Sequence, residues 1–186
     1  IMTKVGAYAL IRTGTLIFGE DAGALAWLTA DWLLPAAIIT TVIGFIGLFA
    51  ARALRDMAAW SVVGSVGVLL SAVSIFRVEA MGPALYYAVH STLAGAALFL
   101  VVDMIAKRRG EHGDALTVAP RFCQSELLSG LFFLSAIGIV GLPPLSGFIG
   151  KLLILDGVRA APEAAWIWAT ILITTLIGVL AFARAG

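Results

Sequence analysis

The sequence predicts an all-α fold, a polytopic bundle of transmembrane helices with about six spans, one of them a broken helix near 141–148. Three observations lead to this class. The chain is 61% hydrophobic and only 12% charged, and that charged share is about half of what a soluble globular domain carries. Apolar runs of roughly 20 residues, enough to cross about 30 Å of hydrocarbon, recur along the chain. One longer apolar stretch is interrupted by GLPPLSGF, whose prolines and glycines disrupt a regular helix.

The apolar runs divide the chain into predicted helices. A further stretch, 125–157, is too long for one straight span, and its apolar pattern alone fits either two spans or one broken helix. The five other predicted spans lie at about 3–18, 32–51, 57–76, 83–106 and 163–184.

Loop charges predict how the helices are oriented, because Lys and Arg favour the cytoplasmic side. Loop 52–56 carries two arginines and loop 107–121 carries four basic residues, so both are expected to face the cytoplasm. Loop 19–31, with three acidic and no basic residues, and loop 77–82 are expected to face outward. Arg184 then ends inside only if 125–157 crosses once, so the charge rule favours one broken helix.

Composition and motifs exclude several function classes. The net charge of +1 and the lack of a basic stripe or zinc-type spacing argue against nucleic-acid binding. The phosphate-loop, HExxH, GxSxG and CxxC motifs of common enzymes are absent from the sequence. No cofactor or metal site is predicted, and one cysteine and few histidines argue against haem or iron–sulfur ligation, while quinone and flavin sites stay open.

The domain organisation is predicted to be simple. Residues 1–186 show no linker or repeat and are interpreted as a single transmembrane domain. The chain opens on an apolar segment without the parts of a signal peptide. We therefore interpret it as a fragment of a longer membrane protein whose upstream helices are missing, with a complete small membrane protein as the alternative.

Lys4 is an ionisable residue inside the first predicted span. It lies 14 residues before Phe18, or about 21 Å along a helix, which is past the midplane of a bilayer. One interpretation is a lysine at a helix start that extends to the headgroups. The other is a proton-carrying amine that faces the protein interior.

Lys151 lies beside the predicted helix break. Freed backbone groups at membrane depth are tolerated only inside protein or along a wet cavity, and broken helices with polar residues at the break recur as ion sites. The alternative is that 146–157 begins a new helix and Lys151 extends outward. The predicted break consists of Gly141, Pro143, Pro144, Gly147 and Gly150.

His90 lies near the middle of an apolar span. A lone histidine in such a place is either a packed, hydrogen-bonded residue or a proton relay. Closer to the cytoplasmic end, Asp103 and Lys107 are four residues apart, which predicts an ion pair on one helix face.

Four motifs resemble those of one known family, in the family's order. The chain is similar to the antiporter-like membrane subunits, which comprise the proton-pumping subunits of complex I and the large subunits of Mrp-type sodium/proton antiporters. It most resembles the D-type subunit of Mrp antiporters, with the M-type subunit of complex I close behind. The motifs are TKVGAYALIR (3–12), ALRDMAAWSVVGSVG (53–67), YYAVHSTLAGAALFL (86–100) and GLPPLSGFIGKLLIL (141–155).

The resemblance implies an ion-translocating subunit in which protons move along a mid-membrane axis through Lys4, His90, water and Lys151. It implies protons and possibly Na⁺ as the transported ions, with the lipid bilayer and other subunits of a hetero-oligomeric complex as partners. Arg55 falls on a basic loop position with a surface or packing role. The alternatives are a pumping subunit of complex I or of a membrane-bound hydrogenase and, from another class, a structural membrane scaffold.

Some residues depart from the family pattern. Ala94 replaces a lysine that some members carry, which argues against the A-type subunit of Mrp antiporters and the longest subunit of complex I. Ser65 stands where relatives commonly carry His or Gln, which argues against a relay through 57–76. The family's glutamate–lysine pair belongs to helices before Lys4, so the chain is expected to contain only the later half of the pathway.

Overall fold

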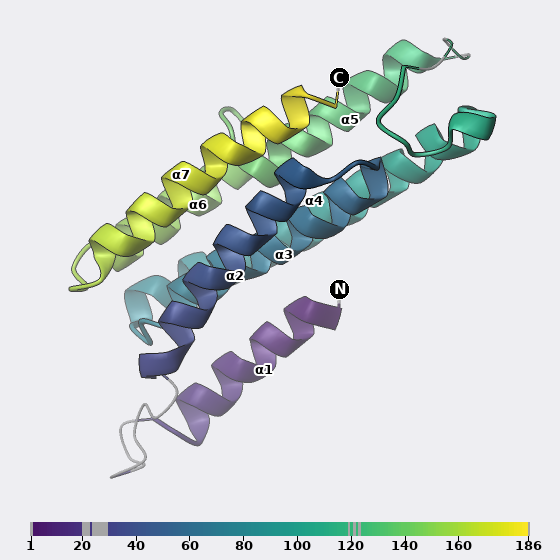
Figure 1. Ribbon diagram of the computed structural model, residues 1–186. Helices are drawn as coiled ribbons and strands as arrows, with labels where there is room; N and C mark the ends of the chain where they lie inside the picture. The colour runs from purple at the N-terminus through teal and green to yellow at the C-terminus, as the bar shows by residue number, and fades with distance from the viewer. Residues whose placement is uncertain are drawn as a thin grey trace.

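The computed structural model describes residues 2–19, 23, 30–118, 120, 122 and 124–185. Within this part the chain is helical, with only an isolated β-bridge besides, so the all-α prediction is confirmed (Figure 1). Glu20, Asp21 and Arg121, whose charges entered the orientation argument, lie outside the described residues. The helices are α1 (Met2–Leu16), α2 (Ala30–Ala50), α3 (Leu54–Val73), α4 (Val78–Arg108), α5 (Ser125–Val140), α6 (Ser146–Val158) and α7 (Ala164–Ala183), with a 3-10 turn at Gly110–His112.

Four of the described helices are long and apolar enough to cross a membrane, namely Trp32–Ala50, Leu54–Val73, Val78–Arg108 and Ala164–Ala183. The largest difference from the predicted bounds is in α4, which begins five residues before Pro83, where the span was expected to start. Proline removes one helical hydrogen bond, here the one to the Glu79 carbonyl. The helix therefore continues through Pro83 at the cost of a single backbone bond.

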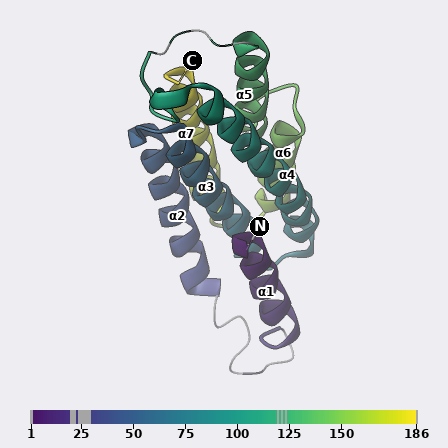
Figure 2. The same cartoon turned by 90° about the vertical axis from the view of Figure 1, so that its right-hand side faces the viewer.

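The segment 125–157 crosses the bundle once, as one broken helix, and the two-span alternative is wrong. Helix α5 is followed by α6 in the same direction, and both lie along α4 (Figure 2). The contacts run in opposite order along the two segments: Gly157 lies beside Glu79, Gly150 beside Tyr87, Ser146 beside His90 and Ile139 beside Gly95.

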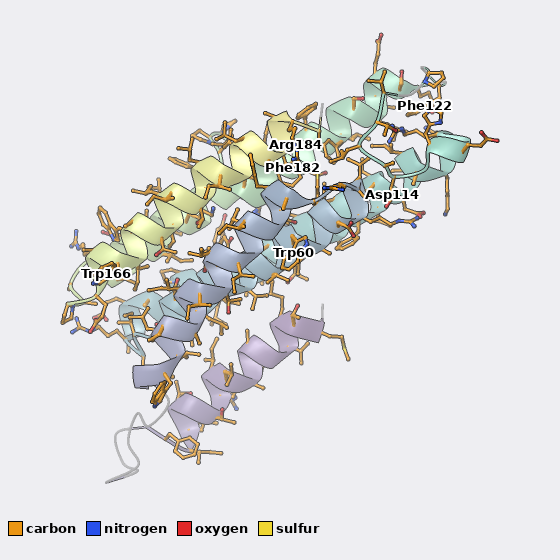
Figure 3. The ribbon with its side chains drawn as sticks, viewed as in Figure 1. Trp60, Asp114, Phe122, Trp166, Phe182 and Arg184 are labelled. Atoms are coloured by element: carbon orange, nitrogen blue, oxygen red, sulfur yellow. The ribbon has the colours of Figure 1, made fainter. Side chains whose placement is uncertain are left out.

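Hydrogen bonds at the two ends of the bundle support this single crossing. At one end the Arg184 guanidinium donates to the Ala51 carbonyl at 2.6 Å. At the other end Arg77 donates to the Ala160 carbonyl at 3.3 Å. Figure 3 shows Arg184 and Trp166 at opposite ends of α7. The chain therefore leaves α7 at the end where α2 finishes, as the broken-helix prediction requires.

Loops 52–56 and 107–121, both predicted to be cytoplasmic, lie at the same end of the bundle. The Leu54 N–H donates to the Asp114 carbonyl at 2.8 Å and the Leu116 N–H donates to the Arg52 carbonyl at 3.0 Å. These two bonds pair the loops side by side. Whichever side of the membrane one of them faces, the other faces it too.

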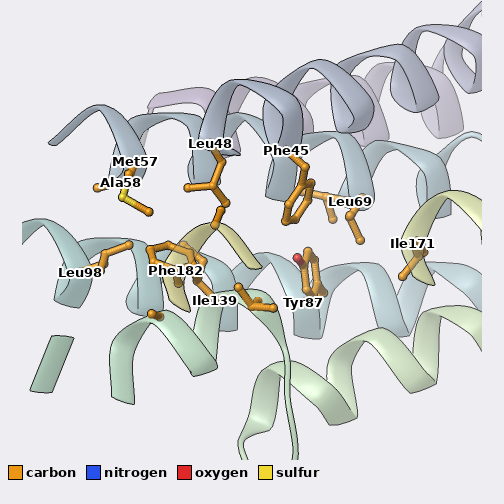
Figure 4. Packing of buried hydrophobic residues seen from close by; sticks show 14 of the residues in the cluster. Phe45, Leu48, Met57, Ala58, Leu69, Tyr87, Leu98, Ile139, Ile171 and Phe182 are labelled. Carbon is orange, nitrogen blue, oxygen red and sulfur yellow. The ribbon is translucent and has the colours of Figure 1, made fainter. Parts of the chain in front are cut away.

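Apolar side chains from α2 to α7 form one core (Figure 4). Helix α1 adds a narrow stripe, because its buried residues recur every three to four positions and so share one helical face. The other faces of α1 are largely exposed. The buried stripe consists of Lys4, Ala7, Ile11 and Gly14. The only charged residue of the stripe, Lys4, is thereby directed toward α3 and α4.

Candidate functional site

Two lysine side chains lie inside the helix bundle. Lys4 is 8% exposed and Lys151 is 4% exposed. A buried ammonium group loses its hydration, so its hydrogen-bond donors must find acceptors in the protein. The acceptors of these two lysines come from different sources.

Lys4 connects three helices through side-chain hydroxyls. Its Nζ donates to Ser65 Oγ on α3 at 3.0 Å and to Ser91 Oγ on α4 at 2.9 Å. Each serine donates its own hydrogen to a carbonyl of its own helix, Val62 for Ser65 and Tyr87 for Ser91. Because the hydroxyl hydrogens are already used, both serine oxygens are left to accept from the ammonium group. The side chain therefore points inward and does not extend along its helix toward the headgroups.

Lys151 bonds to the helix break itself. Its Nζ donates to the Val140 carbonyl at 2.8 Å and to Thr175 Oγ1 on α7 at 2.7 Å. In an unbroken helix the Val140 carbonyl would accept from residue 144, but Pro144 has no N–H. The proline thus frees the acceptor that Lys151 uses. The ammonium also lies 5.5 Å from the centre of the Phe45 ring, a separation at which a cation is attracted to an aromatic face.

His90 joins the two halves of the broken helix. Its Nε2 is 3.0 Å from the Gly138 carbonyl in α5, and its Nδ1 is 2.9 Å from Ser146 Oγ at the start of α6. A carbonyl can only accept, so in the neutral ring Nε2 carries the hydrogen and Nδ1 accepts from the serine. Both ring nitrogens have a hydrogen-bond partner. This arrangement is typical of a packed, hydrogen-bonded histidine.

The glycines of the break make room for close contacts. A Cβ at Gly147 would collide with the Gly138 carbonyl and lie 2.7 Å from His90 Nε2. A Cβ at Gly150 would lie 3.1 Å from the Tyr87 ring. Gly141 has a φ of +80°, a left-handed conformation that glycine adopts without steric cost. These glycines therefore allow α6 to pack closely against α4 and the end of α5.

The three predicted site residues bond to α4 or to the helix break, but they do not bond to one another. Lys4 bonds to Ser91, the residue after His90, while His90 and Lys151 both bond to the last turn of α5. Among the residues that the structure describes, no hydrogen bond joins Lys4, His90 and Lys151 directly. The same part of the chain contains no group of three or more His, Cys, Asp or Glu that could hold a metal ion.

Sequence reasoning missed the partners of both lysines. Serine and threonine are common in membrane helices, where the hydroxyl usually bonds to a carbonyl of its own helix. Nothing in the sequence therefore distinguishes a serine that also accepts from a lysine. Ser65 stands where relatives commonly carry His or Gln, and this difference argued against a relay through 57–76. Its hydroxyl is nevertheless a direct partner of Lys4. The missed partners are Ser65, Ser91 and Thr175.

The exposed charges form a separate network near one end of the bundle. Asp103 accepts from Lys107 at 2.6 Å, which confirms the predicted ion pair, and from Arg55 at 3.0 Å. Arg55 thus connects α3 to α4. Arg55 and Lys107 are largely exposed and Asp103 is 40% exposed, and ion pairs in contact with solvent contribute little to stability.

The sequence is similar to those of membrane transport subunits. The profile of the family described as "NADH:quinone oxidoreductase/Mrp antiporter, TM" matches residues 1–178. The D-type subunit of a probable K(+)/H(+) antiporter from Rhizobium meliloti is 33% identical over 100% of this chain and 40% of its own length. The D-type subunit of the Na(+)/H(+) antiporter from Bacillus subtilis is 32% identical over 88% of this chain and 32% of its own length.

Two solved structures share the fold. A chain of the Mrp complex from Dietzia sp. DQ12-45-1b is 25% identical with a TM-score of 0.82, over 98% of this chain and 33% of that chain. A chain of respiratory complex I from Thermus thermophilus with bound NADH is 25% identical with a TM-score of 0.78, over 97% of this chain and 38% of that chain. The chain thus spans at most 40% of the length of these relatives.

Proposed function

The chain belongs to the NADH:quinone oxidoreductase/Mrp antiporter transmembrane family, and we propose that it is the ion-translocating part of the D-type subunit of an Mrp-type cation/proton antiporter. The relatives named above as D-type subunits support this type. The observation that carries the proposal is the bond from Lys151 to the Val140 carbonyl that Pro144 frees. A helix is interrupted inside the membrane, and the acceptor that it releases holds an ionisable group.

Lys4, His90 and Lys151 belong to one proton axis in this proposal, with the two lysines as the proton carriers. Two ammonium groups inside one bundle repel each other, so protonating one disfavours the charged form of the other. A proton that arrives at one lysine therefore promotes release from the other. The rest of the protein determines from which side protons enter and leave. Given those two sides, the repulsion between the lysines drives proton transfer in one direction.

His90 acts on the axis through the broken helix. Its ring bonds to both halves of the break, and Lys151 lies on the second half, where it bonds to the end of the first. A histidine that bridges the two halves holds Lys151 at its acceptor. Proton transfer along the axis then depends on His90 even where the proton itself moves through water.

The transported cation and the partners follow from the subunit type. The Rhizobium meliloti relative is named for K⁺ and the Bacillus subtilis relative for Na⁺, so we propose a monovalent cation exchanged for protons. The protein would lie in a bacterial inner membrane among other subunits of a hetero-oligomeric complex. Loops 52–56 and 107–121 would face the cytoplasm, in keeping with their basic residues.

Substituting each lysine in the full-length protein, within its assembled complex, tests the proposal. Lys4→Ala and Lys151→Ala should abolish proton-coupled antiport in membrane vesicles, measured as the pH change that added Na⁺ or K⁺ induces. Assembly of the complex should be unchanged. The sequence has three lysines, and the third, Lys107, is 75% exposed, so Lys107→Ala is the matched control and should transport normally. Wild-type transport in both interior variants would refute the proposal and favour a membrane scaffold.

The second candidate is a proton-pumping subunit of a respiratory complex. The fold match to complex I, with a TM-score of 0.78, favours it over other membrane functions. Affinity purification of the full-length protein distinguishes the two. Quinone reductase activity in the purified complex indicates the respiratory assembly, and cation-dependent proton flux without that activity indicates the antiporter.

A further inference from the structure

Tyr87 is a buried polar residue that the proposed function does not use. Its side chain is 1% exposed, and its hydroxyl has no hydrogen-bond partner among the described residues. Buried polar atoms in native proteins are nearly always bonded, and an exception requires an explanation. Ordered water is the usual partner when the protein supplies none.

The Tyr87 ring lies close to groups of both lysine sites. The Lys4 ammonium is 5.8 Å from the ring centre. The backbone of Gly150, the residue before Lys151, lies so close that a Cβ there would be 3.1 Å from the ring. In Figure 4 the Tyr87 ring projects into the core, toward Phe45 and Leu69. Phe45 is in turn the ring that the Lys151 ammonium faces.

The groups around Tyr87 have unused hydrogen-bonding capacity. An ammonium group has three N–H donors, and both Lys4 and Lys151 make two hydrogen bonds to described residues. Within the described part of the chain, one donor of each ammonium group is therefore unused. A tyrosine hydroxyl can donate once and also accept. Water inside a protein needs two to four polar partners, and the Tyr87 hydroxyl and the unused lysine donors are groups to which water can bond.

We propose that the Tyr87 hydroxyl, with bound water, is the link through which a proton passes between Lys4 and Lys151. This inference rests on the proposed function. In the transfer the Lys4 ammonium gives one proton to a water molecule, and that water gives one of its hydrogens to the Tyr87 oxygen. The hydroxyl releases its own hydrogen to water on the other side, and the neutral amine of Lys151 takes up a proton from there. One proton is lost by Lys4 and gained by Lys151, while the phenol and the waters end unchanged.

His90 is less suited to be this link. Both of its ring nitrogens are bonded to the break, and its ring is only half-buried. Tyr87 instead is fully buried, one helical turn from Ser91, whose hydroxyl accepts from Lys4. The structure thus separates two tasks on α4: Tyr87 connects the lysines, and His90 positions the broken helix.

Removing the single oxygen atom tests the link. Tyr87→Phe in the full-length protein keeps the ring that packs against Gly150, so the complex should assemble with its wild-type thermal stability. The rate of antiport should fall by about tenfold or more, since a positioned proton-transfer group contributes at least that much. Tyr86→Phe is the matched control, because Tyr86 is the neighbouring tyrosine and is 41% exposed. It should transport normally.

The outcomes separate this inference from the proposed function. If Lys4→Ala and Lys151→Ala abolish antiport while Tyr87→Phe transports normally, the tyrosine link is wrong and the lysine axis stands. If the lysine variants transport normally, the axis itself is wrong. Should Tyr87→Phe fail to assemble, a high-resolution cryo-electron microscopy map of the wild-type complex decides. Water density bonded to the Tyr87 hydroxyl supports the link, and its absence overturns it.

Discussion

The two buried lysines are satisfied in contrasting ways. Lys4 lies on a continuous helix, and both of its acceptors are serine side chains on other helices. Lys151 lies just after an interruption, and one of its acceptors is a main-chain carbonyl of the preceding helix. The first site therefore depends on which side chains α3 and α4 present. The second depends on the shape of the backbone.

This difference indicates how each site can be lost. A hydroxyl is removed by one substitution, whereas a carbonyl is present whatever the side chain. The Lys4 site should consequently be sensitive to conservative changes at its serines. The Lys151 site should be weakened less by the loss of its threonine than by a change that moves α6 relative to α5.

Among the substitutions that compare the two sites without removing a lysine, Gly147→Ala should have the largest effect, because it acts on the break that holds Lys151. The added Cβ would collide with the Gly138 carbonyl and with His90, and overpacking of this kind costs about 1–3 kcal/mol. The two halves of the broken helix would have to separate. We expect loss of antiport and a lower temperature of unfolding for the purified complex, measured by size-exclusion chromatography after heating.

Gly130→Ala is the control for this change, because a Cβ at Gly130 in α5 would meet no atom within 4 Å. Its transport and thermal stability should match those of the wild type. If Gly147→Ala behaves like Gly130→Ala, the close packing at the break is not required.

The double variant Ser65→Ala, Ser91→Ala should have the next largest effect. It removes both hydrogen-bond acceptors of Lys4 and leaves the charge in place. A hydrogen bond to a charged group is worth about 1.5–3 kcal/mol, so the ammonium form of Lys4 should be strongly disfavoured. Antiport in vesicles should fall by about tenfold or more. Equal transport in the double variant and the wild type would mean that other groups satisfy Lys4.

Thr175→Val should have the smallest effect of the three. It keeps the volume near Lys151 and removes one acceptor, while the Val140 carbonyl remains. The loss should be about one order of magnitude at most, since a single bond to the ammonium is removed. Measured side by side with the serine double variant, a larger loss for Thr175→Val would reverse the contrast between the two sites.

Much of this architecture could be predicted from residue patterns. The apolar runs located the described helices to within five residues at each end, and the loop charges selected one broken helix over two spans. The error at α4 arose because Pro83 was taken as a helix start, whereas a helix can continue through a proline by losing one bond. Lys4, Lys151 and His90 stood out because charge and polarity are rare at membrane depth.

The residue pattern could not predict the hydrogen-bond partners of these residues. Ser65 and Ser91 are 26 residues apart in the chain and ordinary in type, and they become acceptors because the Lys4 side chain reaches both α3 and α4. In the sequence, Tyr87 is one of several aromatic residues in an apolar span. Its neighbours along the chain do not indicate that its hydroxyl is buried without a partner among the described residues.

Local chemistry was therefore enough to specify where the helices lie and which one breaks. Hydropathy, loop charge and the missing N–H of proline are all properties of neighbouring residues along the chain. Which groups each lysine reaches, and what lies between the lysines, depend on how helices distant in sequence pack together. That packing turns His90 toward the break and Tyr87 toward the core, although the two side chains leave the same helix within one turn.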